Sequence, residues 1–277
     1  MHSPLPPLSS RLVIDALVRA DGTVSLGQAY SVANALGIPD QRMRLTVGRL
    51  LAEGRFTKSG RGRAGVLTRT TSADVEERHD VEFVALAYAQ DRGEAPWDGC
   101  WRLISVSVPE SNRALRDHVR RTLLRLGAAL LPGGIYLSPH DLTALLLAEA
   151  PELADQKTLL VAHAHELTLA GVSDPRQIAA AAWPLSPVAA AHHELNQLLE
   201  HPPAFAGPDA PVARAMTWAH AFDLAHRQDP LLPPELLPQP WIGTTTRASF
   251  ARAWNSLEID PTLFQRFRTA TDDPNHH

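Results

Sequence analysis

The sequence contains little of what several large classes of protein require. It has one cysteine, Cys100, in 277 residues, which excludes an intramolecular disulfide, a Cys-based zinc finger and an iron–sulfur site. No uncharged apolar run approaches the roughly 20 residues that a membrane span needs. The first residues, MHSPLPPLSSR, lack the apolar core of a signal peptide. We therefore expect a cytoplasmic protein with no membrane partner.

Common enzyme motifs are also missing: there is no HExxH, no GxSxG elbow, no Walker loop and no GxGxxG after a strand. Among the thirteen histidines, His163 and His165 would face the same side of a strand, but two ligands do not make a structural metal site. Ser138, His140 and Asp141 are catalytic residue types, yet neighbours in sequence rarely form a triad. We expect no enzymatic activity, no cofactor and no bound metal.

Charge is distributed unevenly along the chain. The net charge is −4, but residues 1–72 contain ten Lys/Arg and four acidic residues and so carry +6, which leaves −10 on the remaining 205 residues. A basic segment attached to an acidic body indicates a polyanionic partner for that segment alone. We call residues 1–72 the head.

Residues 9–56 of the head predict three helices. Ser9 and Ser10 offer an N-cap to the first helix, Gly37 stops the second, and Asp40 is placed to cap the third. The expected helices are residues 11–20, 24–37 and 41–53. The last two, joined by a short Gly-containing turn, form a helix-turn-helix pattern.

Helical spacing divides the third helix into two sides. The core side comprises Met43, Val47, Leu50 and Leu51. On the opposite side, arginine suits guanine edges or phosphates, glutamine suits adenine, and leucine suits a thymine methyl group in a major groove. We expect this side to bind DNA through Gln41, Arg42, Arg44, Leu45 and Arg49.

The stretch RFTKSGRGRAGVLTRT that follows has apolar ends around a basic turn. It predicts a β-hairpin, which in this position is the wing of a winged helix. The expected phosphate-contacting residues of its tip are Lys58, Arg61 and Arg63.

The rest of the chain predicts an α+β fold. After a helical connector, a strand follows Asp98-Gly99, a helix spans residues 110–127, and GGIYLSP and TLLVAHA are strands around a helix from Leu142 to Glu149. This order indicates a ferredoxin-like sandwich. A helical C-terminal domain follows, with the proline-rich strap DPLLPPELLPQPW packed across it. The expected domains are residues 1–72, 73–96, 97–172 and 173–277.

Three runs, in the same order along the chain, resemble one family. They are MRLTVGRLLAEGRF at 43–56, PWDGCWRLISVSVPESNRALRDHVRRTLLRLGAALLPGGIYLSPHDL at 96–142 and DPLLPPELLPQPWIGTTTRASFARAW at 229–254. They are similar to the recognition helix, the central domain and the C-terminal signature of the PaaX family of repressors, which control phenylacetate degradation. Arg44, Arg49 and Leu50 stand at that family's typical positions. Gly48, often Ser in the family, departs from it.

The resemblance implies a winged-helix head, a Cas2-like middle domain and a helical C-terminal domain in a homodimeric repressor. It also implies release from operator DNA by an aromatic acyl-CoA such as phenylacetyl-CoA. Such an effector asks for cations near its phosphates and an apolar slot for its acyl group. The candidate effector-binding residues are Arg113, Arg116, Arg120, Trp183, Arg214, Trp218 and Phe222.

Two alternatives stay open from the sequence. The first is a metal-dependent nuclease that uses the Cas2-like domain, although its expected first strand ends Ile104-Ser105-Val106-Ser107 with no carboxylate for Mg²⁺. The second is an effector-independent architectural DNA-binding protein. Neither alternative changes the expected fold.

Overall fold

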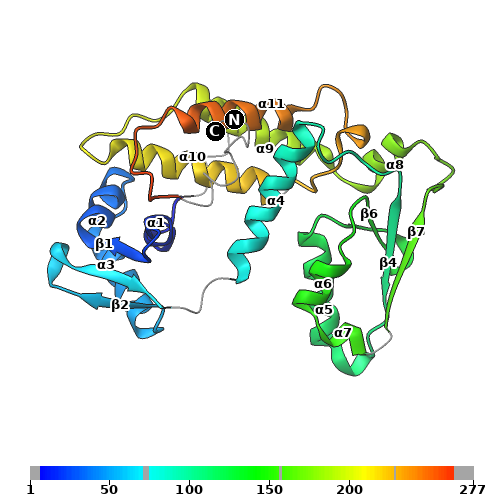
Figure 1. The fold of residues 1–277 in the computed structure, drawn as a ribbon, viewed down its shortest axis with the longest axis horizontal. Helices are drawn as coiled ribbons and strands as arrows, with labels where there is room; N and C mark the ends of the chain where they lie inside the picture. The colour runs from blue at the N-terminus through cyan, green and yellow to red at the C-terminus, as the bar shows by residue number, and fades with distance from the viewer. Residues whose placement is uncertain (1–6, 71–74, 156–157, 228, 265–277) are drawn as a thin grey trace. The chain divides into compact units, whose positions relative to one another are not determined.

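The computed structural model describes residues 7–70, 75–155, 158–227 and 229–264 (Figure 1). The chain packs as two compact units. Unit 1 comprises Met1–Tyr88, His192–Ala225 and Thr244–His277, and unit 2 comprises Ala89–Ala191 and His226–Gly243. Within the described ranges, no helix combines the length and the apolar character that crossing a membrane requires.

The head, in unit 1, consists of three helices and a three-stranded antiparallel sheet. Strand β3 lies between β1 and β2, and the β2–β3 hairpin pairs Phe56 with Arg69 and Ser59 with Val66. In Figure 1 these are the blue and light-blue elements. In chain order they are α1 Ser10–Ala16, β1 Thr23–Ser25, α2 Leu26–Ala35, α3 Asp40–Ala52, β2 Phe56–Ser59, η1 Gly62–Ala64 and β3 Val66–Arg69.

The helix boundaries in the head agree in part with the sequence signals. The Ser9 hydroxyl caps α1 by accepting from Leu12 N at 3.1 Å, and Gly37 follows α2 with φ +73°. Residues 24 and 25, expected to be helical, instead belong to β1, because their backbone pairs with β3. The expectation that Asp40 caps α3 is wrong: Pro39 is the N-cap and makes no side-chain cap bond, and Asp40 is the first helical residue.

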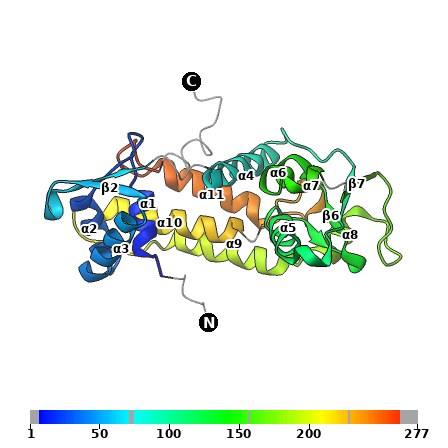
Figure 2. The same ribbon diagram turned by 90° about the horizontal axis from the view of Figure 1, so that it is seen from below.

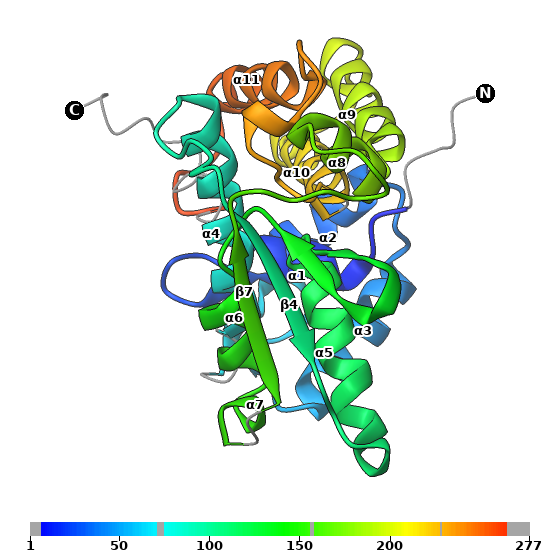
Figure 3. The ribbon, with the colours of Figure 1, turned by 90° about the vertical axis from the view of Figure 1, so that its right-hand side faces the viewer.

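Unit 2 is built on a four-stranded antiparallel sheet in the order β5-β6-β4-β7. The β-α-β-β-α-β connectivity is that of a ferredoxin-like sandwich. Helices α5 and α6 lie on one face of the sheet, behind β4 and β7 in Figure 3. The elements are β4 Trp101–Val106, η2 Glu110–Asn112, α5 Arg113–Arg125, β5 Ala129–Leu130, η3 Pro132–Gly134, β6 Tyr136–Ser138, α6 Thr143–Glu149, α7 Glu152–Asp155 and β7 Leu159–Ala164.

The two faces of this sheet have different coverings. On α5, Leu115, Val119 and Leu123 are buried, as helical periodicity predicted. A second cluster joins Trp101 of β4 to Trp183, whose rings are 6.2 Å apart, and to the leucines of the proline-rich strap. Helix α8 Pro175–Ala182 and the turn η4 Pro234–Leu236 complete this side. The strap therefore packs within unit 2, against Trp101 and Leu137 of the sheet as well as α8. The expectation that it lies across the C-terminal helical domain alone is wrong in part.

Four further helices connect or complete the units: α4 Val75–Asp91, α9 Leu185–Glu200, α10 Ala210–Arg227 and α11 Ile242–Asn255. Figure 2 shows α9, α10 and α11 side by side. Aromatic rings join α10 to α11, since the centroids of Phe222 and Phe250 are 4.1 Å apart. Within α11, the centroids of Phe250 and Trp254 are 5.4 Å apart. The four-domain division at residues 72, 96 and 172 stays a prediction.

Gly127 makes a close backbone contact in unit 2. It follows α5 with φ +85°, and a Cβ atom there would lie 2.7 Å from the carbonyl oxygen of Pro230. Its own carbonyl accepts from the Trp183 indole at 2.8 Å. Both the positive φ and the crowding therefore demand glycine.

We expect Gly127→Ala to lower the free energy of unfolding by about 2–4 kcal/mol, through backbone strain and the clash with Pro230. Gly171→Ala is the matched control, because Gly171 has φ +84° but a Cβ added there would meet nothing within 4 Å. It should cost only the left-handed strain, about 1–2 kcal/mol. Urea unfolding measures both, and equal losses would refute the close contact.

Candidate nucleic-acid interface

Helix α3 presents two chemically different sides. Its buried side consists of Met43, Val47 and Leu50, which are between 0% and 7% exposed. Leu51, expected on this side, is only partly buried. The opposite side is exposed and comprises Gln41, Arg42, Arg44, Leu45, Gly48 and Arg49. All five residues expected on the DNA-facing side of this helix are therefore open to solvent.

The exposed side carries several arginines that have no ion-pair partner among the described residues. Arg42, Arg44 and Arg49 form no ion pair with any described residue. Leu45 is 67% exposed, the highest value among the large hydrophobic residues in the described ranges. At Gly48 an added Cβ would meet nothing within 4 Å, so packing within the chain does not require glycine there. This surface therefore combines guanidinium groups with an exposed leucine and with helix backbone that no side chain covers at Gly48. It suits a polyanion that also carries apolar groups.

The β2–β3 hairpin contributes a second basic group of residues. Residues 60–65 connect its strands, and Lys58, Arg61 and Arg63 are all exposed. Lys58 and Arg61 have no ion-pair partner among the described residues. Arg63 differs, because its Nη2 donates to Asp40 Oδ2 at 2.8 Å. This long-range pair, 23 residues apart, has no signal in the local sequence.

The candidate effector-binding residues fall in different parts of the structure. Arg113, Arg116 and Arg120 lie on α5 and Trp183 lies between α8 and α9, all in unit 2. The other three share one side of α10 in unit 1; they are Arg214, Trp218 and Phe222. All three candidate aromatic residues, Trp183 included, are buried to at least 95%. The tryptophan and phenylalanine side chains thus have core environments.

One shallow pocket of 110 Å³ lies in unit 2. Its lining includes Trp183, Val188, Arg125, Arg227 and Pro230. Its lining also includes Asp229, so the pocket carries charges of both signs beside the apolar Trp183 and Val188. Of the seven candidate effector residues, only Trp183 lines it.

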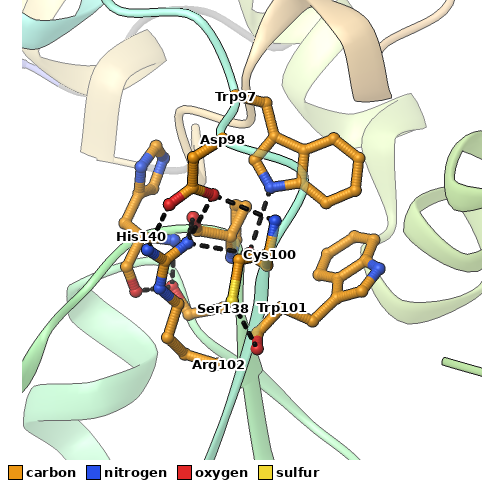
Figure 4. A network of polar contacts seen from close by, with 8 residues as sticks. Trp97, Asp98, Cys100, Trp101, Arg102, Ser138 and His140 are labelled. Atoms are coloured by element: carbon orange, nitrogen blue, oxygen red, sulfur yellow. Dashed lines mark hydrogen bonds and ion pairs between the residues drawn. The ribbon is translucent and has the colours of Figure 1, made fainter. Parts of the chain in front are cut away.

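A polar network at the start of β4 holds three segments of unit 2 together (Figure 4). The Arg102 guanidinium donates to both carboxylate oxygens of Asp98, and to the carbonyls of Cys100 at 2.8 Å and Pro139 at 2.9 Å. Asp98 also accepts from Cys100 N at 3.0 Å. The hydrogen bonds from Arg102 hold the pKa of Asp98 at about 2, below its ordinary value of 3.8.

Ser138 and His140, which the sequence offered as catalytic residue types, belong to the same network. The Ser138 hydroxyl donates to the backbone carbonyl of His140 at 2.9 Å, and the His140 Nε2 donates to the Leu231 carbonyl at 2.8 Å. Burial lowers the pKa of His140, so the ring is neutral at physiological pH. Serine and imidazole therefore have structural partners and do not form a nucleophile–base pair. Among the described residues, no three His, Cys, Asp or Glu side chains are grouped as a metal site requires.

Two family models and one curated relative match the chain. The model of the PaaX protein central Cas2-like domain matches residues 94–179, and that of the PaaX-like protein C-terminal domain matches residues 183–265. The transcriptional repressor PaaX of Escherichia coli (strain K12) is 28% identical over 265 residues, which cover 87% of this chain and 76% of that protein.

A solved structure, the uncharacterized protein Rv0674 from Mycobacterium tuberculosis, is similar in fold with a TM-score of 0.57 at 18% identity. The similarity covers 95% of this chain and 97% of that one. The chain therefore combines a Cas2-like domain with a PaaX-like C-terminal domain that follows it directly. The chain belongs to the PaaX family.

We expect Asp98→Asn to lower the free energy of unfolding by about 1–2 kcal/mol at neutral pH, since it leaves Arg102 without its ion pair while Asp98 itself is half-exposed and screened. The folded pKa near 2 lies below the ordinary 3.8, so the carboxylate stabilises the fold above pH 3.8 and loses this effect as the pH falls toward 2. The Tm values of the variant and the wild type, measured by thermal unfolding, should therefore approach each other as the pH is lowered.

Asp117→Asn provides the control for this experiment. Asp117 lies 3.8 Å from Arg113 on the surface of α5, and both side chains are at least half exposed. Its removal should change stability by under about 0.5 kcal/mol. An effect equal to that of Asp98→Asn would contradict a special role for the Arg102 network.

Proposed function

We propose that the chain is a DNA-binding transcriptional repressor whose head is a winged helix-turn-helix. The observation that carries the proposal is the exposed side of α3, where three arginines without ion-pair partners among the described residues stand beside an exposed leucine and an open glycine. The repressor activity named for the Escherichia coli relative supports it. In this proposal α3 enters a major groove and the β2–β3 hairpin is the wing.

Each side chain on α3 has a specific task in this proposal. Arg44 and Arg49 read guanine edges, Gln41 reads adenine, and Leu45 meets a thymine methyl group, which compensates for its exposure in the free protein. Gly48 lets the helix backbone approach the groove. On the wing, Lys58 and Arg61 bind phosphates and set the position of the head without reading sequence.

A homodimer follows from the same proposal. One recognition helix reads only a few base pairs, so specific repression uses two heads on a two-fold symmetric operator. The half-sites would then lie about 34 Å apart along the DNA, or a multiple of this distance. The acidic remainder of the chain, with its charge of −10, disfavours DNA contact outside the heads.

The effector in this proposal is an aromatic acyl-CoA or a related small molecule that releases the repressor from DNA. Arg113 and Arg120 are exposed on α5 and offer charge to its phosphates. The pocket of 110 Å³ beside Trp183 is far below the roughly 300–1,000 Å³ of pockets that enclose drug-sized ligands. Only the acyl end of such an effector would enter it, and the remainder would lie on the surface.

We expect Arg49→Ala to lose about 1–3 kcal/mol of discrimination between a preferred duplex and a scrambled one, because it removes a base contact. Arg61→Ala should weaken binding to both duplexes and reduce the slope of log affinity against log salt by about 1. The preferred duplex is selected by the wild-type protein from a random-sequence library, and fluorescence anisotropy measures affinity over a salt series.

Arg252→Ala is the charge-matched control, since Arg252 is an exposed arginine of α11 outside the head. It should leave both duplexes bound as by the wild type. The DNA should also stay intact on incubation with Mg²⁺ or Mn²⁺, as a repressor requires and a nuclease does not. Wild-type binding by both head variants would refute the proposed docking.

A panel of aromatic and aliphatic acyl-CoAs, with coenzyme A and the free acids as controls, tests the effector. A true effector at 100 times its Kd should stabilise the protein by about 2.7 kcal/mol and so raise Tm by a few degrees. The same compound should release the selected duplex. A panel in which no compound shifts Tm or affinity would favour an effector-independent DNA-binding protein.

A further inference from the structure

The wing tip is folded back onto the head rather than projecting freely. The backbone N–H of Leu26, at the start of α2, donates to the Gly65 carbonyl at 3.0 Å. A Cβ at Gly27 would lie 3.1 Å from the Arg63 carbonyl oxygen, so the loop passes close over the start of α2. Gly60, with φ +76°, has the Gly65 backbone against it in the same loop. These contacts fix the backbone from which the Arg63 side chain extends.

Arg63 then joins three elements through one side chain. Its Nη2 donates to Asp40 Oδ2 at 2.8 Å, at the first residue of α3. Its guanidinium carbon lies 5.4 Å from the ring centroid of Tyr30, a buried residue of α2. An ion pair on one side and a ring face on the other give the guanidinium a defined position.

Asp40 explains why this position matters for a helix that faces DNA. The N-terminus of a helix attracts phosphates, but Asp40 is the acidic residue in the first turn of α3 and would repel them. Arg63 offsets that charge. Both partners here are about half exposed, so the pair contributes at most about 1 kcal/mol to stability, and its loss should leave the fold intact.

We infer that Arg63 is a positioning residue, which neutralises Asp40 and locks the wing to the N-terminus of α3 so that helix and wing meet DNA as one rigid body. The inference rests on the proposed function. It gives Arg63 a role different from Lys58 and Arg61 of the same hairpin, which have no ion-pair partner among the described residues. A phosphate contact affects all DNA alike, whereas an orienting residue affects the discrimination between sequences.

The test compares Arg63→Gln with Arg61→Gln, which removes the same charge from the same loop. Affinities are measured for the duplex selected by the wild type and for its scrambled version. Arg63→Gln should lower the ratio of the two affinities by roughly tenfold, the scale of one lost base-pair preference. Arg61→Gln should weaken both affinities and leave their ratio unchanged.

A charge swap makes the test independent of simple charge loss. The double variant Asp40→Arg with Arg63→Asp keeps the net charge and rebuilds the pair in reverse, so it should restore most of the ratio. Arg63→Lys retains the charge, so it should also keep most of the ratio of the two affinities. Thermal unfolding of each variant should stay close to wild type, which separates loss of orientation from loss of fold.

Three results would overturn the inference while leaving the proposed function intact. Arg63→Gln could weaken both duplexes equally, as expected for a phosphate contact. It could change neither affinity. The swapped pair could also discriminate no better than Arg63→Gln alone. A wild-type head that binds selected and scrambled duplexes alike would instead overturn the proposed function itself.

Discussion

Burial of one side of α3 fixes the rotation of that helix about its own axis, and the surface of the head depends on this rotation. Met43 and Leu50 can leave water only if the helix turns them inward, which turns Arg42, Arg49 and Leu45 outward. The hydrophobic effect therefore does more than stabilise the head. It determines which side chains are available to a partner, and it holds them on a rigid element where their spacing is defined.

The polar interactions of the two units serve different purposes. In unit 2, Arg102, Asp98 and His140 bind backbone carbonyls and N–H groups that the strands and the strap leave unpaired. These backbone groups are thereby satisfied within the fold, and the side chains that bind them have little freedom for chemistry. In the head, by contrast, Arg42 and Arg49 on α3 and Arg61 on the hairpin have no ion-pair partner within the described ranges. Satisfied polar groups support architecture, and unsatisfied exposed charge is what a polyanion recognises.

Periodicity and turn residues predicted much of the fold. The buried positions Leu115 and Val119, the cap at Ser9 and the stop at Gly37 follow from local rules and are confirmed. Strand β1 was not predictable, because its three residues are extended only through pairing with β3, some forty residues later. The two-residue strand β5 was missed for a related reason, since its register with β6 comes from the sheet.

The sequence by itself determined the segregation of charge, the helical spacing that divides α3 into two sides, and the family resemblance in three ordered runs. These depend on the order of residues along the chain and need no contact between distant segments. Only the tertiary structure decided that Arg63 meets Asp40 and Tyr30, and that the candidate effector residues belong to two different units. Such relationships arise from loop closure and packing, which bring together residues far apart in sequence and so leave no local pattern.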